Sequence, residues 1–383
     1  MKKKNIVLKK SFWTKRNIIL LACIILLVAL GSLFAVHYLE VSNSMLSSHL
    51  IYTLQNNVVK SIAVSENLLI GTDKGDIVLM SPTGKIVWRQ SVKSTVYTLD
   101  CSPDSNYVIA GGTSFHLYDI NGKELFDKGI ANYIPYKSRF IDNKTIALLY
   151  QSLSDLSFSC LTVDYTGKTI NSQKINDLGE TASLDLSQDG SVLFAGERGE
   201  VYRIANGKLV SDAIIDKKLS TVHQIFGFYL NNNTVVVGYE ISSSTDSSNV
   251  PVYFYDNNLK LVKSIDVPGN INNFSIDNGN VIFATDGGFF TYSQNGTLQG
   301  QKTQSDLIGL EFGQNPEYDM YVYEKKPVQE KDKPVINVLL TDKNGNLKGS
   351  YLYTFDTTPG ITLSANGKII FVTERNKVSI LTK

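Results

Sequence analysis

The stretch Leu117-Tyr118-Asp119-Ile120-Asn121-Gly122-Lys123-Glu124-Leu125-Phe126 decides the fold of this chain. Apolar residues alternate on both sides of Asn121-Gly122, and Asn-Gly between two alternating runs is the strongest short signal for a β-hairpin. Similar turns recur at residues 81–85, 164–168, 205–208, 256–258, 294–297 and 342–346. Six of the seven turns carry Asn-Gly or Thr-Gly, so the chain is built from repeated hairpins.

The spacing of these turns predicts the architecture. Successive turn glycines are 38 to about 50 residues apart, which is the period of a four-stranded propeller blade. An alternating strand such as 115–120 precedes each turn, and a dense apolar strand such as 107–111 precedes that. β-branched and aromatic residues dominate, with no helical period beyond residue 48. We predict an all-β propeller of four-stranded antiparallel blades.

The two ends of the repeat region predict how the ring closes. We name the strands of a blade A to D from the inside outward. Seven turns join strand C to strand D, but the last unit, residues 360–383, supplies only A, B and C. Residues 50–55 form a spare strand, which we expect to pair with the C-terminal strands as the missing D, because closure removes open sheet edges. The count is eight blades. Seven is the alternative if two weak units around residues 215–300 merge.

The N-terminus carries a candidate membrane anchor. From Ile18 to Val36 run 19 residues with nothing more polar than Cys, Gly and Ser. A helix of that length spans about 28 Å, close to the thickness of the hydrocarbon core. The run is longer than the apolar region of a cleaved signal peptide, which favours a retained signal-anchor. Seven basic residues and no acidic residue precede it, a charge bias that keeps the N-terminus in the cytoplasm.

These features divide the chain into four parts. They are a basic cytoplasmic tail (1–17), a single transmembrane signal-anchor helix (18–37), a linker (38–48) and a propeller ectodomain (49–383). The predicted location is the cytoplasmic membrane, with the propeller outside. Beyond the tail, 30 basic residues face 36 acidic ones. A mildly acidic body argues against nucleic acid as the partner.

One segment carries a family resemblance. Ile77-Val78-Leu79-Met80-Ser81-Pro82-Thr83-Gly84-Lys85-Ile86-Val87-Trp88 resembles the repeat of PQQ-type (WD40- or quinoprotein-like) β-propellers, and residues 117–126 are a looser copy. Overall the chain looks most like membrane-anchored propellers of Gram-positive bacteria. Quinoprotein dehydrogenases of this family stack their quinone between a tryptophan and a vicinal disulfide and bind calcium. Here no two cysteines are adjacent and Trp88 is the only tryptophan of the ectodomain, so we expect no cofactor.

No sequence motif indicates catalysis or a metal site. The chain has no G-x-S-x-G, H-E-x-x-H, C-x-x-C or P-loop motif, and we expect a protein that is not an enzyme. Its four histidines, residues 37, 49, 116 and 223, show no ligand spacing. Cys101 and Cys160 are too few for a disulfide framework, and each lies in an apolar strand pattern that predicts a small buried side chain.

Three connections between strands B and C are longer than the others. They are residues 152–157, 241–249 and 325–333, and a tyrosine followed by Gln or Glu ends strand B before each. The candidate interaction residues are Tyr150, Gln151, Tyr239, Glu240, Tyr323, Glu324 and Lys325. Two interpretations stay open, because loops both carry function and tolerate insertion. In one, the long loops are surface insertions that the fold tolerates. In the other, they form a partner-binding face with tyrosine as an amphipathic contact residue.

Propeller geometry adds an orientation. B–C and D–A connections share one face, and the linker enters a D strand, so we predict that the C–D face lies nearest the membrane and the long loops point away. The predicted role is a non-catalytic scaffold for a protein or a cell-envelope polymer. The alternatives are a quinoprotein-like oxidoreductase, supported only by repeat resemblance, and a sensory ectodomain that works with a membrane partner.

Overall fold

The computed structural model of the protein describes residues 47–382 except for a set of short segments. Those left out are 143, 156, 176–181, 188–190, 197–198, 206–207, 215–221, 232–233, 242–248, 278, 304–306, 315–317, 326–334, 345, 355–359 and 365–368. Leu46–Thr382 forms one compact unit. The predicted anchor from Ile18 to Val36 lies outside the described residues. Within them, no helix has the length and apolar character needed to cross a membrane.

The described residues form eight antiparallel sheets of four strands each. Blade one contains β2 (Val58–Val64), β3 (Asn67–Thr72), β4 (Asp76–Met80) and β5 (Ile86–Ser91). Blade two contains β6 (Thr98–Cys101), β7 (Tyr107–Gly111), β8 (Phe115–Asp119) and β9 (Glu124–Lys128). Blade three contains β10 (Tyr133–Phe140), β11 (Thr145–Ser152), β12 (Phe158–Asp164) and β13 (Thr169–Ile175). Blade four contains β14 (Ala182–Leu186), β15 (Val192–Gly196), β16 (Glu200–Ala205) and β17 (Lys208–Ile214).

The second half of the ring repeats this order. Blade five contains β18 (Val222–Asn231), β19 (Thr234–Ile241), β20 (Asn249–Asp256) and β21 (Leu261–Pro268). Blade six contains β22 (Ile271–Asp277), β23 (Asn280–Thr285), β24 (Gly288–Tyr292) and β25 (Leu298–Lys302). Blade seven contains β26 (Leu307–Gln314), β27 (Tyr318–Lys325), β28 (Val335–Asp342) and β29 (Leu347–Thr354). Blade eight contains β30 (Gly360–Leu363), β31 (Ile370–Glu374), β32 (Lys377–Thr382) and β1 (Ser47–Thr53).

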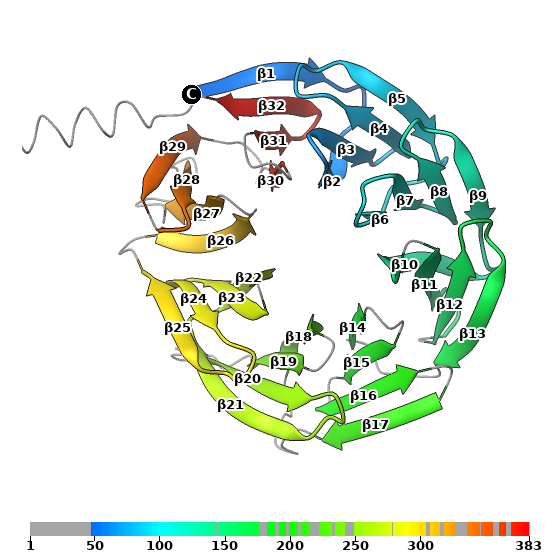
Figure 1. Ribbon diagram of the computed structural model, residues 1–383, viewed down its shortest axis with the longest axis vertical. Coiled ribbons are helices and arrows are strands. Elements are labelled where there is room, and N and C mark those ends of the chain that lie inside the picture. Colours follow the sequence, from blue (N-terminus) through cyan, green and yellow to red (C-terminus); the bar gives the residue numbers. More distant parts are fainter. Residues whose placement is uncertain are drawn as a thin grey trace, which may run out of the picture. The chain divides into compact units, whose positions relative to one another are not determined.

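Figure 1 shows the blades around a common centre, with strand A of each blade innermost. The predicted eight-bladed propeller is confirmed. The seven-blade alternative is wrong, because the weak region forms two separate sheets, blades five and six. The predicted closure is also confirmed: β1 pairs antiparallel with β32, from Ser47 opposite Thr382 to Thr53 opposite Lys377. The first and last strands of the ring therefore complete one blade together.

Side-chain hydrogen bonds explain how strand C turns into strand D. Asp119 Oδ1 accepts bonds from the N–H groups of Asn121 and Lys123, both at 2.9 Å, as Asx turns do. Gly122, between these two residues, has a φ of 84° in the left-handed region. A β-bulge at Leu117 and Tyr118 shifts the pairing beside the turn. The same place is held by Asp164, Asp256, Asp342, and in blades one and six by the hydroxyls of Ser81 and Ser293.

The core is divided among the junctions between blades. Buried apolar residues gather into eight clusters, and each cluster draws on two neighbouring blades. The cluster between blades one and two contains Trp88 and Tyr118, whose rings lie 5.8 Å apart. A blade buries both of its faces, so its B and C strands carry continuous apolar runs. The ring is therefore stabilised at its junctions, one blade against the next.

At two successive junctions, an aromatic residue of the outer strand contacts a turn glycine of the next blade. Trp88 of β5 packs against Gly122, and its Nε1–H donates a hydrogen bond of 2.9 Å to the Ile120 carbonyl in the C–D turn of blade two. One blade further, Phe126 of β9 packs against Gly167 in the corresponding turn. The aromatic residue changes, but the bare glycine surface beneath it is retained. These contacts tie the outer strands of blades one and two to the turn of the blade that follows.

Candidate functional site: the loop face

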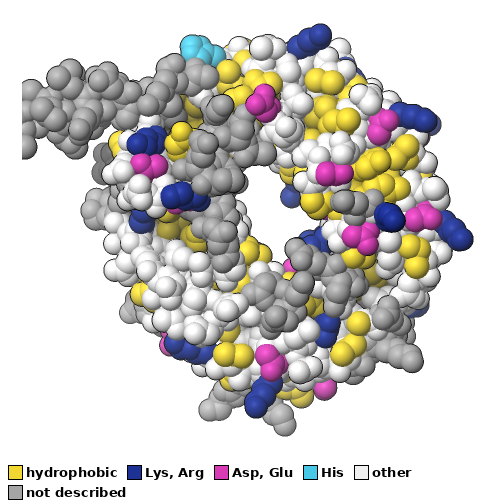
Figure 2. All heavy atoms as spheres, in the orientation of Figure 1, with side chains coloured by type: hydrophobic (Ala, Val, Ile, Leu, Met, Phe, Trp, Pro, Cys, Tyr) yellow, Lys and Arg dark blue, Asp and Glu magenta, His cyan; other side chains and the backbone are white. Residues whose placement is uncertain are grey.

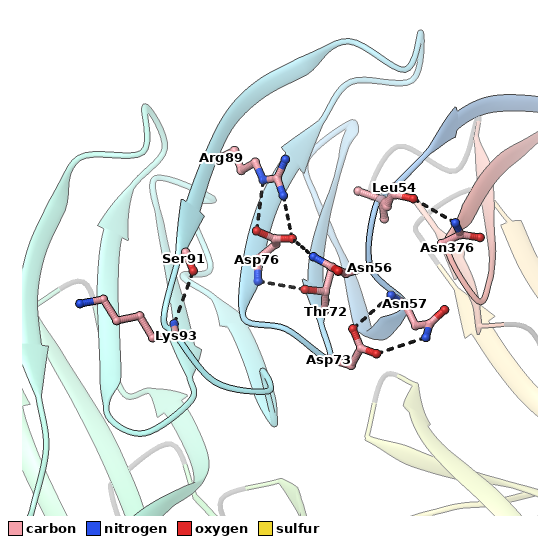
Figure 3. A network of polar contacts seen from close by, with 10 residues as sticks. All are labelled: Leu54, Asn56, Asn57, Thr72, Asp73, Asp76, Arg89, Ser91, Lys93 and Asn376. Carbon is pink, nitrogen blue, oxygen red and sulfur yellow. Dashed lines mark hydrogen bonds and ion pairs between the residues drawn. The ribbon is translucent and has the colours of Figure 1, made fainter.

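The face that carries the D–A and B–C connections, which we call the loop face, is tied together where the ring closes. The N–H of Leu54 donates to the Asn376 carbonyl at 2.7 Å, and Asn376 Nδ2 donates back to the Leu54 carbonyl at 3.0 Å. Leu54 lies in the connection from blade eight to blade one, and Asn376 in the B–C turn of blade eight (Figure 3). The two kinds of connection thus share one face, as the propeller geometry predicts.

An Asn–Asp clamp holds this face at two places. In blade one, Asn57 Nδ2 donates to Asp73 Oδ2 at 3.1 Å, across a separation of 16 residues (Figure 3). In blade six, Asn270 Nδ2 donates to Asp286 Oδ2 at 2.8 Å, again 16 residues apart. In both blades the asparagine directly precedes strand A and the aspartate directly follows strand B. The clamp fixes each D–A connection to its own B–C turn.

A denser polar group lies beside the blade-one clamp. Asp76 Oδ2 accepts a hydrogen bond from Asn56 Nδ2 at 2.6 Å and lies 2.8 Å from Arg89 Nη2. Asp76 Oδ1 accepts a bond from Arg89 Nε at 3.2 Å. Figure 3 shows these side chains converging from three segments of blade one. Because all the polar atoms named here are paired with one another, the group holds the fold rather than offering an open binding site.

The three long connections join strands B and C as predicted, but two of the tyrosines before them, Tyr150 and Tyr323, differ from the prediction. Tyr150 is fully buried, its ring lies 5.0 Å from Phe115, and its hydroxyl donates to the Lys128 carbonyl at 2.7 Å. Tyr323 is also buried, with its ring 4.9 Å from Phe289, and burial raises the pKa of its hydroxyl to about 12. The prediction that these two rings contact a partner is wrong. Each shares a strand face with core residues, and alternation points it inward.

The other predicted interaction residues lie at the ends of the same strands. Gln151 and Glu324 are partly buried, opposite Phe158 and Ile336 respectively. Tyr239 and Glu240 lie on β19, and Lys325 is the last residue of β27; their side chains fall outside the described part of the chain. So do residues 242–248 and 326–334 of the second and third long loops. A binding role for these loops stays a prediction.

The long loop of blade three is described except for residue 156, and hydrogen bonds among its described residues hold it. Ser152 Oγ accepts bonds from the N–H groups of Ser154 and Asp155, both at 3.2 Å. Asp155 Oδ1 accepts from the Ser157 N–H at 3.0 Å and from the Ser157 hydroxyl. The bonds from Ser157 and Ser152 lower the pKa of the Asp155 carboxyl to about 2. The loop therefore has a preformed shape.

This ordered loop presents an apolar side chain to solvent. Leu153 is 67% exposed, and its N–H donates to the Asn132 carbonyl at 2.8 Å. On strand A of the same blade, Tyr136 is 38% exposed, with its ring edge-on to Phe158 at 5.4 Å. Tyr97, 50% exposed, lies in the D–A connection that enters blade two. We call Tyr97, Tyr136 and Leu153 the blade-three patch.

Contacts through Gly111 link the segments that carry Tyr97 and Tyr136. The N–H of Tyr97 donates to the Gly111 carbonyl at 2.8 Å. A side chain on Gly111 would come within 2.8 Å of Pro135, the residue before Tyr136. A bulge between Pro135 and Lys137 shifts the pairing of β10 with β11 at Tyr136. The sequence prediction missed these three residues, although a leucine in an otherwise polar loop such as 152–155 is the signal that could have identified one of them.

Charged side chains gather on the inner strands of blades two to four. Figure 2 shows an opening at the centre of the ring with charged groups at its wall. Lys137 Nζ lies 2.6 Å from Asp185 Oδ1, and Arg139 Nη1 lies 3.8 Å from Asp185 Oδ2. Asp185 Oδ2 also accepts the Tyr229 N–H at 2.9 Å. In Asp100, burial raises the carboxyl pKa to about 6, against the opposing bond from the Cys101 N–H.

The two ectodomain cysteines and the acidic groups form no metal centre in the described part of the chain. No group of three or more His, Cys, Asp or Glu side chains there could hold an ion. Cys101 and Cys160 are free thiols. Burial raises the pKa of Cys101 to about 11 and that of Cys160 to about 12. Cys160 is buried and Cys101 partly so, in agreement with the expectation of small apolar-type side chains.

Comparisons with known proteins identify the class of fold. No protein-family model matches the chain, and no curated protein matches it in sequence. BamB from Moraxella catarrhalis is similar in structure over 89% of this chain and 97% of its own, with a TM-score of 0.52 and 10% identity. A protein of unknown function from Bacteroides caccae is similar over 63% of this chain and 94% of its own, with a TM-score of 0.41 and 13% identity. The likeness to BamB is one of fold: the chain is a β-propeller.

Proposed function

We propose that this protein is an interaction scaffold, anchored by the run from Ile18 to Val36 on the outer side of the cytoplasmic membrane. Its loop face would bind a partner, and recognition there requires no bond-breaking chemistry. The observation that carries the proposal is the blade-three patch. It comprises a hydrogen-bonded loop that holds Leu153 out in solvent, the exposed Tyr136 on strand A of the same blade, and the exposed Tyr97 at the entry to blade two. We favour a protein partner over a cell-envelope polymer, because aromatic and aliphatic anchors are typical of protein interfaces.

The order of the loop matters for this role. Binding costs entropy when side chains and loops must be fixed, and a preformed loop has already met much of that cost. The bonds around Ser152 and Asp155 fix the backbone that carries Leu153. Tyrosine adds contact area with few rotatable bonds. A surface of this kind suits a specific protein contact of moderate affinity.

Site-specific photocrosslinking in cells tests the binding face. A photoreactive amino acid at Leu153 should capture a discrete, protease-sensitive partner. The matched control is Ile170, which is 58% exposed but lies on outer strand β13 of the same blade, and it should capture much less. Equal capture at both sites, or none at Leu153, Tyr136 and Tyr97, would contradict the proposal. A protease-resistant, glycosidase-sensitive adduct would identify a polymer instead.

A thiol-labelling experiment tests the anchored, outward arrangement. Burial raises the pKa of both native ectodomain thiols, so we expect them to react slowly with the reagent. Ser154→Cys, in the exposed loop of blade three, should react with a membrane-impermeant maleimide on intact protoplasts. Ser11→Cys, in the basic tail, should react only after lysis. The reverse pattern, or release of the protein from washed membranes, would refute this arrangement.

A further inference from the structure

The outer hairpin of blade two brings a serine, a histidine and a glutamate together. Ser114 lies in the turn before β8, His116 lies in β8, and Glu124 begins β9. Ser114 Oγ is 3.0 Å from His116 Nε2, and His116 Nδ1 is 2.6 Å from Glu124 Oε1. A nucleophile bonded to a base, with that base oriented by a third group, is the arrangement that activates serine hydroxyls.

Strand geometry explains the convergence. Ser114 and His116 are two residues apart, so alternation places them on the same side of the strand. Glu124 reaches the ring diagonally, because it pairs with Tyr118, the next residue on that side. The His116 ring is held in place: the residue is 8% exposed, and the ring stacks 6.2 Å from Tyr118 with an angle of 9° between their planes.

The hydrogen-bond partners decide which ring nitrogen carries the proton. An ionised carboxylate only accepts hydrogen bonds, so Nδ1 beside Glu124 is assigned as the N–H donor. Nε2 is then the acceptor, directed at the Ser114 hydroxyl. A second carboxylate, Asp127, has an oxygen 3.8 Å from Nε2, beyond hydrogen-bond distance. Ser114 is therefore the closer partner of the basic nitrogen.

The serine is reachable from solvent. It is half-buried, next to the exposed Thr113 in a turn that begins with Gly112, directly after β7 ends at Gly111. On its other side lies the exposed Gly129, where an added Cβ would sit 3.4 Å from the Ser114 Cβ. A glycine at that place has no side chain to cover Ser114.

We propose that Ser114 is an activated nucleophile that accepts acyl groups from small esters, an activity beyond the scaffold role. The Ser114 oxygen bonds to the ester carbonyl carbon, the ester C–O bond breaks, and the serine proton passes through His116 Nε2 to the leaving alkoxide. Water then attacks the acyl-serine with His116 as the base, which releases the carboxylic acid and restores the hydroxyl. Glu124 is a positioning residue that keeps Nε2 facing the serine.

Labelling of the full-length protein in detergent with a fluorophosphonate tests this inference. The serine oxygen displaces fluoride from phosphorus, so mass spectrometry can locate the adduct by peptide. Ser114 should be labelled, whereas Ser154, exposed in a loop and hydrogen-bonded to Ser152, should not. His116→Gln should slow labelling by about 100-fold, the usual contribution of a positioned general base. Asp127→Asn is the matched control and should leave the rate within a factor of a few.

A second variant separates activation from folding. Gly129→Leu should cover the hydroxyl and slow labelling while Ser114, His116 and Glu124 are all kept. Each variant is checked for an unchanged circular dichroism spectrum. Labelling of Ser114 no faster than that of Ser154, or unchanged in a folded His116→Gln protein, would overturn the proposal. Either result leaves the scaffold role untouched, because that role is tested at Leu153.

Discussion

The contact between Trp88 and Gly122 should dominate the junction of blades one and two, and Gly122→Ala tests it. Gly122 is buried with a φ of 84°. A Cβ there would sit 2.7 Å from Trp88 Cγ and 2.9 Å from Cδ2. Two costs therefore add: the left-handed backbone costs alanine about 1–2 kcal/mol, and an overpacked core costs about 1–3 kcal/mol. We expect the free energy of unfolding to fall by about 2–4 kcal/mol after the small gain from a stiffer unfolded chain.

Two other glycines separate these costs. Gly279 has a φ of 79° but nothing within 4 Å of an added Cβ, so Gly279→Ala should lose only about 1 kcal/mol. Gly300 also has open space around it, lies inside β25 and has no positive φ. Because alanine is favoured over glycine in a strand, Gly300→Ala should be neutral or stabilising by up to about 1 kcal/mol.

Urea unfolding of the full-length protein in detergent, followed by circular dichroism, measures all three variants. The free energy of unfolding should be much lower for Gly122→Ala than for Gly279→Ala. That of Gly300→Ala should equal or exceed the value of the parent protein. In a Trp88→Ala background the cost of Gly122→Ala should shrink to that of Gly279→Ala, because the clashing ring is gone. Equal losses for Gly122→Ala and Gly279→Ala would refute the view that glycine is needed beneath the tryptophan.

Three further predictions concern other parts of the ring. Trp88→Phe should fold but lose about 1–2 kcal/mol in urea unfolding, because the Ile120 carbonyl loses its 2.9 Å bond; no loss would show that this bond is unimportant. Burial raises the Asp100 pKa from 3.8 to about 6, so the folded state binds this proton more tightly and its stability falls as pH rises from about 4 to 6. Asp100→Asn should therefore gain about 1–3 kcal/mol over the parent at pH 7.5 relative to pH 4, and a difference that does not vary with pH would contradict the burial. Finally, Leu50→Cys with Ser379→Cys, opposite each other across β1 and β32, should form a disulfide on oxidation. Leu50→Cys with Thr362→Cys, three strands apart in the same sheet, should not, and the reverse on a non-reducing gel would disprove the closure.

How well each candidate site could be predicted from the sequence depends on how far apart in the chain its residues lie. Which strands precede the long loops could be predicted, because the loop lengths are visible in the sequence. The sequence did not show which way Tyr150 and Tyr323 face, because that depends on the register against neighbouring strands. Both rings are buried. The blade-three patch draws Tyr97, Tyr136 and Leu153 from separate segments, so no local pattern indicates it. Ser114, His116 and Glu124 likewise lack a recognisable motif, since Glu124 reaches His116 only through hairpin register.

The sequence by itself determined the repeated hairpin, the blade period and the closure by the first strand. Those features depend on local chemistry: an Asp or Ser that caps the C–D turn, a residue able to adopt a left-handed φ, and alternating apolar runs. Even the departure at Leu259, which holds a φ of 57° where other turns have glycine, left the hairpin intact. Only the tertiary structure decided which side chains meet between blades, because those contacts depend on register and on the rotation of one blade against the next. The turn at Asn121-Gly122 shows both levels. Its hairpin and the left-handed φ of Gly122 are local, whereas the ring that leaves no room for a Cβ belongs to Trp88, 34 residues earlier in another blade.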